Sequence, residues 1–551
     1  MALLVAAGSL PSAGAVNATV DLGYAKYTGQ VLPTGITQWL GMRFAAPPLG
    51  ALRFAAPQDP VAATTAEPIA ATARGPVCLT TGLAIQSTSQ AEDCLFIDVY
   101  APTDATPASK LPVFFYISGG GFNGIGYLDG LELMASANKS FVFVQANYRV
   151  GPYGFLAAPT LAELADGPAP ANNGLRDQRA GLRWVQRHIG RFGGDPAHVV
   201  LGGGSAGAAS IAYHLTSPAA AGLFAGAAAQ SVSFGPVLTT EQSAYQFVKL
   251  AAAVGCAADA TAKPAAALAC LRAAPAAAIQ AACRSNLPYP DFLGTGTGNG
   301  TGNGTGNTQA PIYMWGPTLD GDAVRALPYA ALGAAAPVPL LVGDDTNGGT
   351  MFAPRDTGSL AQSNAFMRAN FPFLTEAMVG RLNGLYPYDP PCFPGAGCWW
   401  RQAANVYGET RYLCASLFVA GAMQRAGGRS WAYWWDVQDP AQEASGLGVP
   451  HTVETAALSG DGAGAPASYQ PGGTNAAAVL AIRAHWASFI TTLDPNTDRA
   501  PGTAEWTPYD AAGGMARLHF ATGGKTSMVD LEPGLKGRCE YLWSMGLANQ
   551  Q

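Results

Sequence analysis

The chain contains 551 residues, of which 49% are hydrophobic and only 12% are charged, and its formal net charge is −6. A disordered polyelectrolyte or a coiled coil needs far more charge than this, and nucleic-acid binding needs a basic cluster that the sequence lacks. Gly contributes 68 residues and Pro 41, about a fifth of the chain, with no collagen-like period. The composition therefore predicts a large, loop-rich globular protein with a weakly charged surface.

Several features of the sequence favour an extracellular location. Residues 1–15 are apolar and end in small residues, which predicts a signal peptide or its remnant, although no basic residue precedes the apolar run. The nine cysteines form no CxxC pair, which favours disulfides over metal ligation, with reduced buried thiols as the alternative. Glycosylation sequons begin at Asn17, Asn138, Asn299 and Asn303. We therefore expect a secreted, disulfide-bonded glycoprotein, and no later apolar run is long enough for a transmembrane segment.

Along the chain, apolar β-rich runs alternate with helical patterns. The helical pattern is clearest over Leu175–Ile189, which is amphipathic. The clearest strands are Val113–Ile117, Phe141–Ala146, Val199–Gly202, Val338–Val342 and Trp431–Val437. This alternation predicts the α/β class, with a large, mostly parallel central sheet flanked by helices.

Two low-complexity stretches interrupt this pattern. Residues 294–308 contain only Gly, Asn and Thr and lack the Asp of calcium-binding repeats, so they predict a flexible surface insert. Residues 460–474 form a second loop rich in Gly, Pro and Ser. Neither stretch separates two self-sufficient halves, so we expect one large domain with long loop insertions.

Ser205 is the candidate nucleophile. It lies in the GxSxG pattern of Gly203–Gly207, which by itself is weak because a chain this rich in Gly matches it by chance. A predicted strand precedes it, however, and the Ala-rich helical stretch Ala206–Leu215 follows, as in a nucleophile elbow. The alternative is a Gly-rich turn with an idle Ser.

A second glycine run, Gly119–Gly121, follows the predicted strand Val113–Ile117. Glycines at the carboxyl end of a strand can turn backbone N–H groups towards an oxyanion. A phosphate-binding loop is the rival interpretation, but no Lys-Ser/Thr pair follows the run. The run therefore predicts an oxyanion hole.

The general base must be sought among six histidines. His451 follows a predicted strand in a Gly/Pro-rich turn, which suits a base brought to a site from a loop. The other histidines lie within helical or strand-like patterns, where structural roles are expected: His188, His198, His214, His485 and His519. We therefore expect His451 to be the base.

A set of longer motifs carries a resemblance to a known family. These motifs are QWLGMRFAAPP (38–48), EDCL (92–95), NYRVG (147–151), DQR (177–179), FGGDP (192–196) and the turn around Ser205. Together they resemble the type-B carboxylesterase/lipase family of α/β-hydrolases over about residues 20–545. The resemblance implies an α/β-hydrolase fold in a single domain.

The same resemblance implies roles for individual residues. Ser205 would be the nucleophile and His451 the base. The oxyanion hole would consist of the backbone N–H groups of Gly120, Gly121 and Ala206. The family disulfides would be Cys78–Cys94 and Cys256–Cys270.

The triad acid departs from the family pattern. Gly348 stands where the family places a Glu, in the stretch Val342–Thr350. Asp345 or Asp344 would have to serve His451 instead, across up to ~10 Å of extended chain. Without a carboxylate the imidazole is not oriented and the imidazolium is not stabilised, which typically lowers turnover by about 10⁴-fold.

These features together predict a serine-dependent carboxyl-ester hydrolase that acts through an acyl-enzyme, impaired if the acid is missing. We expect no cofactor and no metal, and no nucleic-acid partner; the oligomeric state is not predicted. A cation-binding site is not expected, because the loop 78–94 contains no aromatic residue and Gly204 brings no carboxylate to the nucleophile. A neutral small-molecule ester or an acylglycerol is therefore the expected substrate. The alternative is a non-catalytic binding protein with the same fold.

Overall fold

The computed structural model describes residues 18–85, 89–164, 167–256, 259–294, 309–388, 390, 392–460 and 465–551. The expected signal peptide (1–15) and, apart from Gly294, the expected insert (294–308) lie outside the described residues, as do Asn17, Asn299 and Asn303. Asn138 is described and is exposed to solvent.

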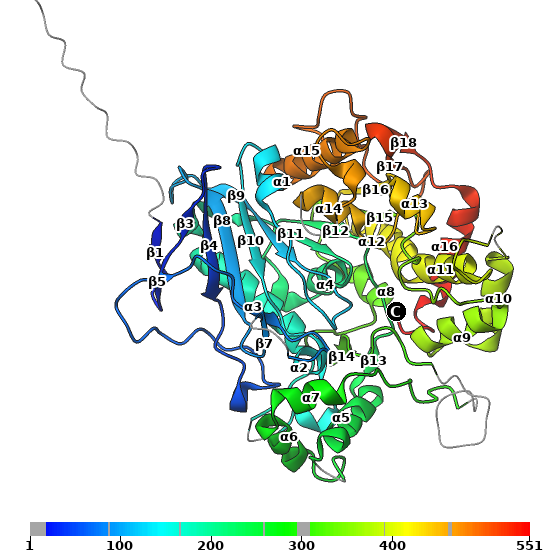
Figure 1. Ribbon diagram of the computed structural model, residues 1–551, viewed down its shortest axis with the longest axis horizontal. Coiled ribbons are helices and arrows are strands. Elements are labelled where there is room, and N and C mark those ends of the chain that lie inside the picture. Colours follow the sequence, from blue (N-terminus) through cyan, green and yellow to red (C-terminus); the bar gives the residue numbers. More distant parts are fainter. Residues whose placement is uncertain are drawn as a thin grey trace, which may run out of the picture.

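The described residues build an eleven-stranded sheet (Figure 1). In spatial order its strands are β18 (Lys525–Val529), β17 (Arg517–Ala521), β16 (Ser430–Asp436), β15 (Leu340–Asp345), β12 (Gly226–Gln230), β11 (Gly194–Gly204), β9 (Leu111–Ile117), β10 (Val142–Ala146), β8 (Phe96–Pro102), β4 (Ile36–Arg43) and β3 (Gln30–Val31). Pairing is parallel from β17 to β10 and antiparallel at both margins. The mostly parallel sheet expected from the sequence is confirmed.

The helices and minor strands surround this sheet. The helices are α1 (Leu131–Ser136), α2 (Gly151–Phe155), α3 (Asn173–His188), α4 (Ala206–Leu215), α5 (Thr240–Val254), α6 (Pro264–Ala273), α7 (Ala276–Ala282), α8 (Pro328–Ala331), α9 (Leu360–Asn370), α10 (Glu376–Leu385), α11 (Trp400–Gly408), α12 (Cys414–Arg425), α13 (Pro440–Ala444), α14 (Val453–Ser459), α15 (Ala476–Thr492) and α16 (Pro533–Gly546). The small sheets pair β1 (Thr19–Asp21), β2 (Lys26–Thr28) and β5 (Ile69–Ala70), then β6 (Val77–Cys78) with β7 (Gln90–Ala91), and β13 (Leu238–Thr239) with β14 (Thr318–Leu319).

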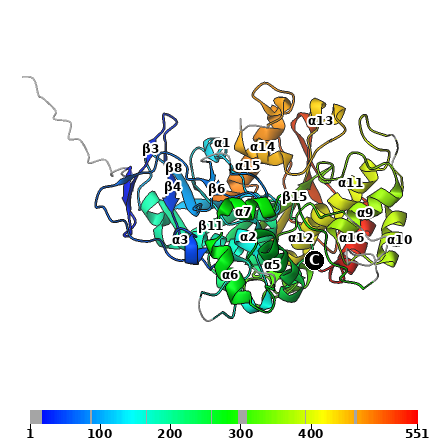
Figure 2. The ribbon, with the colours of Figure 1, turned by 60° about the horizontal axis from the view of Figure 1, so that its bottom comes forward.

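The side chains of the central strands alternate between two cores, because successive residues of a strand point to opposite faces. Phe115 and Leu201 belong to the core covered by α3, α4 and α12. Their neighbours Phe114 and Val200 belong to the core covered by α1, α14 and α15. The two groups of helices lie on opposite sides of the strands (Figures 1 and 2). Burial on both faces explains why these strands are continuous apolar runs.

All five strands predicted from the sequence are present, as β9, β10, β11, β15 and β16, and the predicted amphipathic helix is α3. This parallel sheet with helices on both faces agrees with the α/β-hydrolase fold that the resemblance implies. The predicted boundaries differ by a few residues, mainly because β11 begins at Gly194 and so includes His198.

Several of the recognised motifs form buried ion pairs. Arg149 donates through Nη2 to Asp177 Oδ1 at 2.8 Å, and both side chains are almost fully buried. Arg53 pairs with Glu92 in a similarly buried setting. Removing one partner of such a pair leaves an uncompensated buried charge, at a cost of about 3–5 kcal/mol. These motifs therefore hold the scaffold rather than take part in chemistry.

Within the described ranges, no single helix combines the length and hydropathy that crossing a bilayer requires. The bent pair α6 and α7 passes that test only when its two helices are taken together, and they meet at 114°.

Four disulfides join described residues: Cys78–Cys94, Cys256–Cys270, Cys392–Cys398 and Cys414–Cys539. The first two are the pairs that the family resemblance implies. The last closes a loop of 125 residues between α12 and α16, which sequence spacing gives no reason to expect. Cys283 is a free, buried thiol.

The length of the closed loop predicts unequal contributions of these disulfides to stability. Replacing Cys414 and Cys539 by Ala is expected to lower the free energy of unfolding by about 5 kcal/mol, because the bridge restricts a long loop in the unfolded chain. The matched variant without Cys392 and Cys398, whose loop spans 6 residues, should lose only about 2 kcal/mol. Urea unfolding of both variants measures the difference, and equal losses would contradict the loop-length explanation.

Candidate functional site

Ser205 stands in a strained turn between β11 and α4. Its backbone has φ 56° and ψ −118°, which a residue with a side chain rarely adopts. Its N–H donates to the carbonyl of Gln230 on β12 at 2.8 Å, which ties the turn to the sheet. Gly207 packs so closely on the carbonyl of Ile117 that a Cβ there would overlap it. The turn therefore has the geometry of the predicted nucleophile elbow.

The glycine run lies directly beside this turn. A Cβ on Gly119 would lie 2.9 Å from Ser205 Cβ, so the run and the elbow are in contact. Gly120 and Gly121 have φ of 125° and 60°, which favours glycine at both positions. In the described chain, the N–H groups of Gly120, Gly121 and Ala206 donate to no backbone carbonyl. These three donors are thus available next to the Ser205 side chain.

His451 reaches the same region from the loop between α13 and α14. Asn347 N donates to Val449 O at 2.8 Å and Asn347 Oδ1 accepts from Val449 N at 3.0 Å, which fixes this loop to the end of β15. A Cβ on Gly204 would lie 3.7 Å from Thr452 Cγ2. The residue after His451 therefore packs against the residue before Ser205.

The imidazole of His451 is buried among aromatic rings. It stacks on Tyr412 at 3.9 Å between centroids and meets the edge of Phe352 at 5.4 Å. Neither ring nitrogen has a hydrogen-bond partner among the described residues. Burial and the charge of Arg411 lower the pKa of His451 to about 3. The ring is therefore neutral at ordinary pH, and no carboxylate supports its protonated form.

The other five histidines are held in structural roles. His214 Nε2 lies 2.9 Å from Gln178 Oε1, inside the core. The partners of the others are a backbone carbonyl for His198 and His485, Asp436 for His519, and the rings of Trp184 and Tyr24 for His188. This distribution agrees with the choice of His451 as the candidate base.

Gly348 stands where the family resemblance implies the acid. A Cβ on Gly348 would meet only Tyr412 Cδ2 at 3.7 Å and Asp345 O at 3.9 Å, and the backbone of Gly348 is not left-handed. A small cavity lined by 344–349 and Tyr412 surrounds it. A longer side chain therefore has room here, and Tyr412, which stacks on His451, lies beside it.

The candidate acids Asp344 and Asp345 lie at the end of β15 and are both buried. Asp345 Oδ2 accepts from the backbone N of Thr452 at 2.6 Å and from the Ser231 hydroxyl at 3.2 Å. Neither carboxyl forms a hydrogen bond with the His451 ring in this structure. Asp345 thus holds the backbone beside His451, not its imidazole.

Glu454, which the sequence analysis missed, forms a pair with Asp345. Tyr433 donates to Glu454 Oε1 at 2.8 Å, but Glu454 Oε2 and Asp345 Oδ1 are buried and lack a donor. Burial and the mutual repulsion of the two groups raise the pKa of Asp345 well above its usual range, and burial raises the pKa of Glu454. One proton shared by the two carboxyl groups satisfies both oxygens. The only sequence signal was an acid one helical turn after His451.

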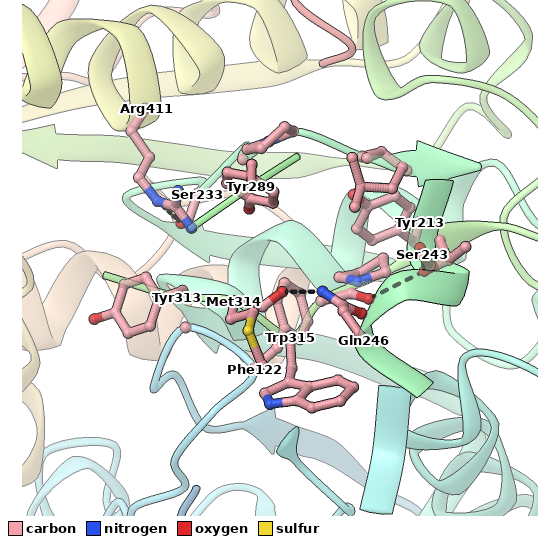
Figure 3. Close-up of a pocket in the computed structure, with 18 residues that line it drawn as sticks. Phe122, Tyr213, Ser233, Ser243, Gln246, Tyr289, Tyr313, Met314, Trp315 and Arg411 are labelled. Atoms are coloured by element: carbon pink, nitrogen blue, oxygen red, sulfur yellow. Dashed lines mark hydrogen bonds between the residues drawn. The ribbon is translucent and has the colours of Figure 1, made fainter. Parts of the chain in front are cut away.

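A cavity begins at the glycine run. Its walls are Gly121 and Phe122, most of 233–238, residues 313–318 and Arg411 (Figure 3). Arg411 lies in a π-helical turn, Glu409–Leu413, between α11 and α12. Trp400 and Trp435 do not line this cavity and are fully buried in the cores.

Helix α16 clamps both ends of the π-helical turn. Arg538 pairs with Glu409 at 2.8 Å, at the start of the turn. The Cys414–Cys539 disulfide fixes the residue that follows the turn. The turn therefore presents Arg411 to the cavity and Tyr412 to His451 in a fixed orientation.

Among the described residues, no group of three His, Cys, Asp or Glu side chains has an arrangement that could hold a metal ion.

Comparisons with known proteins agree with this geometry. A model of the carboxylesterase family matches residues 17–528. The chain is 31% identical to Secreted lipase 1 of Botryotinia fuckeliana (strain B05.10), over 89% of this chain and 87% of that one. It is 39% identical to para-nitrobenzyl esterase of Bacillus subtilis (strain 168), over 41% of this chain and 45% of the other. The crystal structure of Aspergillus niger EstA matches with a TM-score of 0.87 at 34% identity, covering 97% of this chain and 99% of that chain.

The shared proton predicts a pH dependence of stability. The pKa of Asp345 is higher in the folded than in the unfolded chain. Protonated Asp345 therefore adds to the free energy of unfolding at low pH, and this stabilisation is lost as pH rises through the folded pKa. In Glu454→Gln the amide donates to Asp345 in place of the proton, so this loss should be smaller. Urea unfolding between pH 5 and pH 8 measures it, with exposed Glu505→Gln as the control. Parallel pH profiles for wild type and Glu454→Gln would refute the shared proton.

Proposed function

Because the chain belongs to the carboxylesterase family, whose members found here are carboxylic-ester hydrolases, we propose that it hydrolyses esters through an acyl-enzyme on Ser205. The observation that carries this proposal is the strained elbow, which sets Ser205 against the free N–H groups of Gly120, Gly121 and Ala206.

The proposed reaction has two halves. Ser205 Oγ attacks the ester carbonyl while His451 takes its proton, and the three N–H groups stabilise the oxyanion. His451 then returns the proton to the departing alcohol. In the second half, water attacks the acyl-enzyme by the same route and releases the acid. The lowered pKa of His451 disfavours uptake of the Ser205 proton, whereas it favours donation of that proton to the departing alcohol.

The vacant acid position sets the expected rate. With Gly348 in place of a carboxylate, the imidazolium that forms in the transition state has no counter-charge. Asp344 and Asp345 remain candidates only if the end of β15 shifts, because Asp345 is engaged with Thr452 in this structure. We therefore propose low intrinsic activity, with the elbow and oxyanion hole supplying most of the acceleration.

We also propose the location, the glycosylation, the domain organisation and one property of the substrate. Secretion is supported by the disulfides and by the similarity to a lipase named as secreted. Glycosylation is supported at Asn138, which is exposed. We propose that residues 20–545 act as one domain, and that the substrate carries no quaternary ammonium group.

A second candidate function is non-catalytic binding. The specific observation that favours it is the His451 ring, which stacks on Tyr412 and has no partner at either nitrogen in the described chain. Against it stands the strain at Ser205, which a binding protein does not require.

Labelling of Ser205 distinguishes the two. An alkyl phosphonate probe should modify the wild type covalently, and Ser205→Ala should lose both the label and hydrolysis of p-nitrophenyl butyrate, by about 10³-fold or more. Ser210→Ala, a buried serine on the same helix, is the matched control and should keep both. Folded wild-type protein without label or turnover would favour the binding function.

Restoring the acid tests the vacancy. Gly348→Glu is expected to raise kcat by up to about 10⁴-fold, since it supplies the missing counter-charge. The nearby carboxylate should also raise the pKa of His451 and so move the acid limb of the kcat/KM profile to higher pH. Gly348→Gln has the same size without the charge and should gain little. If Gly348→Glu and Gly348→Gln both kept the wild-type kcat, another carboxylate would already serve His451.

A further inference from the structure

Arg411 is a buried cation in the wall of the cavity beside the oxyanion hole. Its side chain is 5% exposed, and it is the only charged residue among those that line the cavity. It extends from the π-helical turn towards Ser233, whose hydroxyl accepts from Nε at 3.0 Å (Figure 3). The guanidinium therefore lies within the same cavity as Gly121.

The charge of Arg411 has no counter-ion in the described chain, where no carboxylate lies within ion-pair distance of it. A guanidinium carries five N–H donors and stays charged at every relevant pH. Burying such a charge without a partner is expensive, so buried arginines are normally paired. Its Nε donates to the Ser233 hydroxyl, and the guanidinium also forms a hydrogen bond with the phenol of Tyr407, but neither of these groups carries a negative charge.

The surroundings of the guanidinium suit an anion. The rings of Tyr313 and Tyr407 lie 5.3 and 5.9 Å from its central carbon, and Tyr289 also lines the cavity near it. Tyrosine hydroxyls donate hydrogen bonds, and the backbone at Gly235 comes close enough to Nη1 that a Cβ there would lie 2.9 Å away. The other residues that line this cavity carry no charge, and a guanidinium can bind a carboxylate through two parallel hydrogen bonds.

The size of the cavity restricts the ligand. The cavity has an open volume of ≈ 30 Å³, and at ~10–15 Å³ for a water-sized group it admits a group about as large as a carboxylate and not a fatty chain. The acyl group stays bound to Ser205 between the two half-reactions, whereas the alcohol must leave. A cavity that begins at Gly121, beside the oxyanion donors, therefore suits the acyl part of the substrate.

We propose that Arg411 binds a carboxylate at the far end of the acyl group, so that the preferred substrates are monoesters of short dicarboxylic acids. This inference rests on the proposed ester hydrolysis at Ser205 and replaces the neutral ester expected from the sequence. The guanidinium of Arg411 and the carboxylate of the substrate would neutralise each other's charge. This ion pair would hold the ester carbonyl beside the oxyanion donors.

The first test compares charged and uncharged acyl groups of equal length. Wild type should hydrolyse monoethyl glutarate at least about 10-fold faster, in kcat/KM, than its terminal amide, ethyl glutaramate, since a charge-assisted hydrogen bond is worth about 1.5–3 kcal/mol. In Arg411→Met this ratio should fall to about one. Arg187→Met, which removes a surface arginine paired with Asp59, should leave it unchanged. Placing the carboxylate on the alcohol instead, as in butanoyloxyacetate, should give no such preference.

The second test measures binding of the free diacid, first by inhibition and then by thermal stabilisation. Glutarate should inhibit wild-type hydrolysis of ethyl butyrate competitively, and glutaramide should not. Glutarate should also raise the Tm of Ser205→Ala but not of Ser205→Ala combined with Arg411→Met. A Tm shift without any ester hydrolysis would refute the proposed function and keep the anion site. The anion site would be refuted if esters were hydrolysed without preference for the charged one and if glutarate neither inhibited the wild type nor raised the Tm of Ser205→Ala. Arg411 would then be only a structural link to Ser233.

Discussion

The strained backbone of Ser205 is the constraint on which the candidate site depends. A positive φ at a residue with a side chain costs about 1–3 kcal/mol and persists only where the surroundings enforce it. Here the enforcement comes from the hydrogen bond to Gln230 on β12 and from the contact between Gly207 and Ile117 on β9. Both neighbouring strands of β11 thus hold the turn. The result is a hydroxyl at the carboxyl edge of the sheet, where the glycine run and the start of α4 supply N–H donors.

The base is positioned by its backbone more than by its ring. The loop that carries His451 is fixed through Val449 to Asn347, and through Thr452 to Asp345. The imidazole itself meets only aromatic rings, with Tyr412 beside the vacant position of the acid. The position of His451 is therefore fixed, while no carboxylate forms a hydrogen bond with its ring in the described chain. Since the acid both orients the imidazole and stabilises its charge, packing against Tyr412 replaces at most the first of these two roles.

The parts of the molecule that the sequence predicted are those encoded locally. Apolar runs predicted the five strands, and a strand, glycines and a helix around Ser205 predicted the elbow, because each signal lies within some twenty residues. Arg411 and Glu454 could not be predicted, since their roles arise from elements that meet only in the fold. Arg411 is the only charged residue between Glu409 and Arg425. A single charge in a helical segment whose apolar residues belong in a core is only a weak sign of a functional role. The pairing of Cys414 with Cys539 was equally hidden by its long separation.

The double clamp of α16 on the π-helical turn makes the cavity wall depend on the redox state of its surroundings. Where the Cys414–Cys539 bond is absent, as in a reducing cytosol, the turn that carries Arg411 and Tyr412 would rely on the Arg538–Glu409 ion pair, whose side chains are 26% and 15% exposed. Ion pairs near the surface weaken as salt is added, whereas the sheet and the elbow at Ser205 do not rely on either clamp. Protein produced in such a compartment would thus keep its fold and its nucleophile but show substrate selectivity that varies with ionic strength, a symptom easily mistaken for partial misfolding.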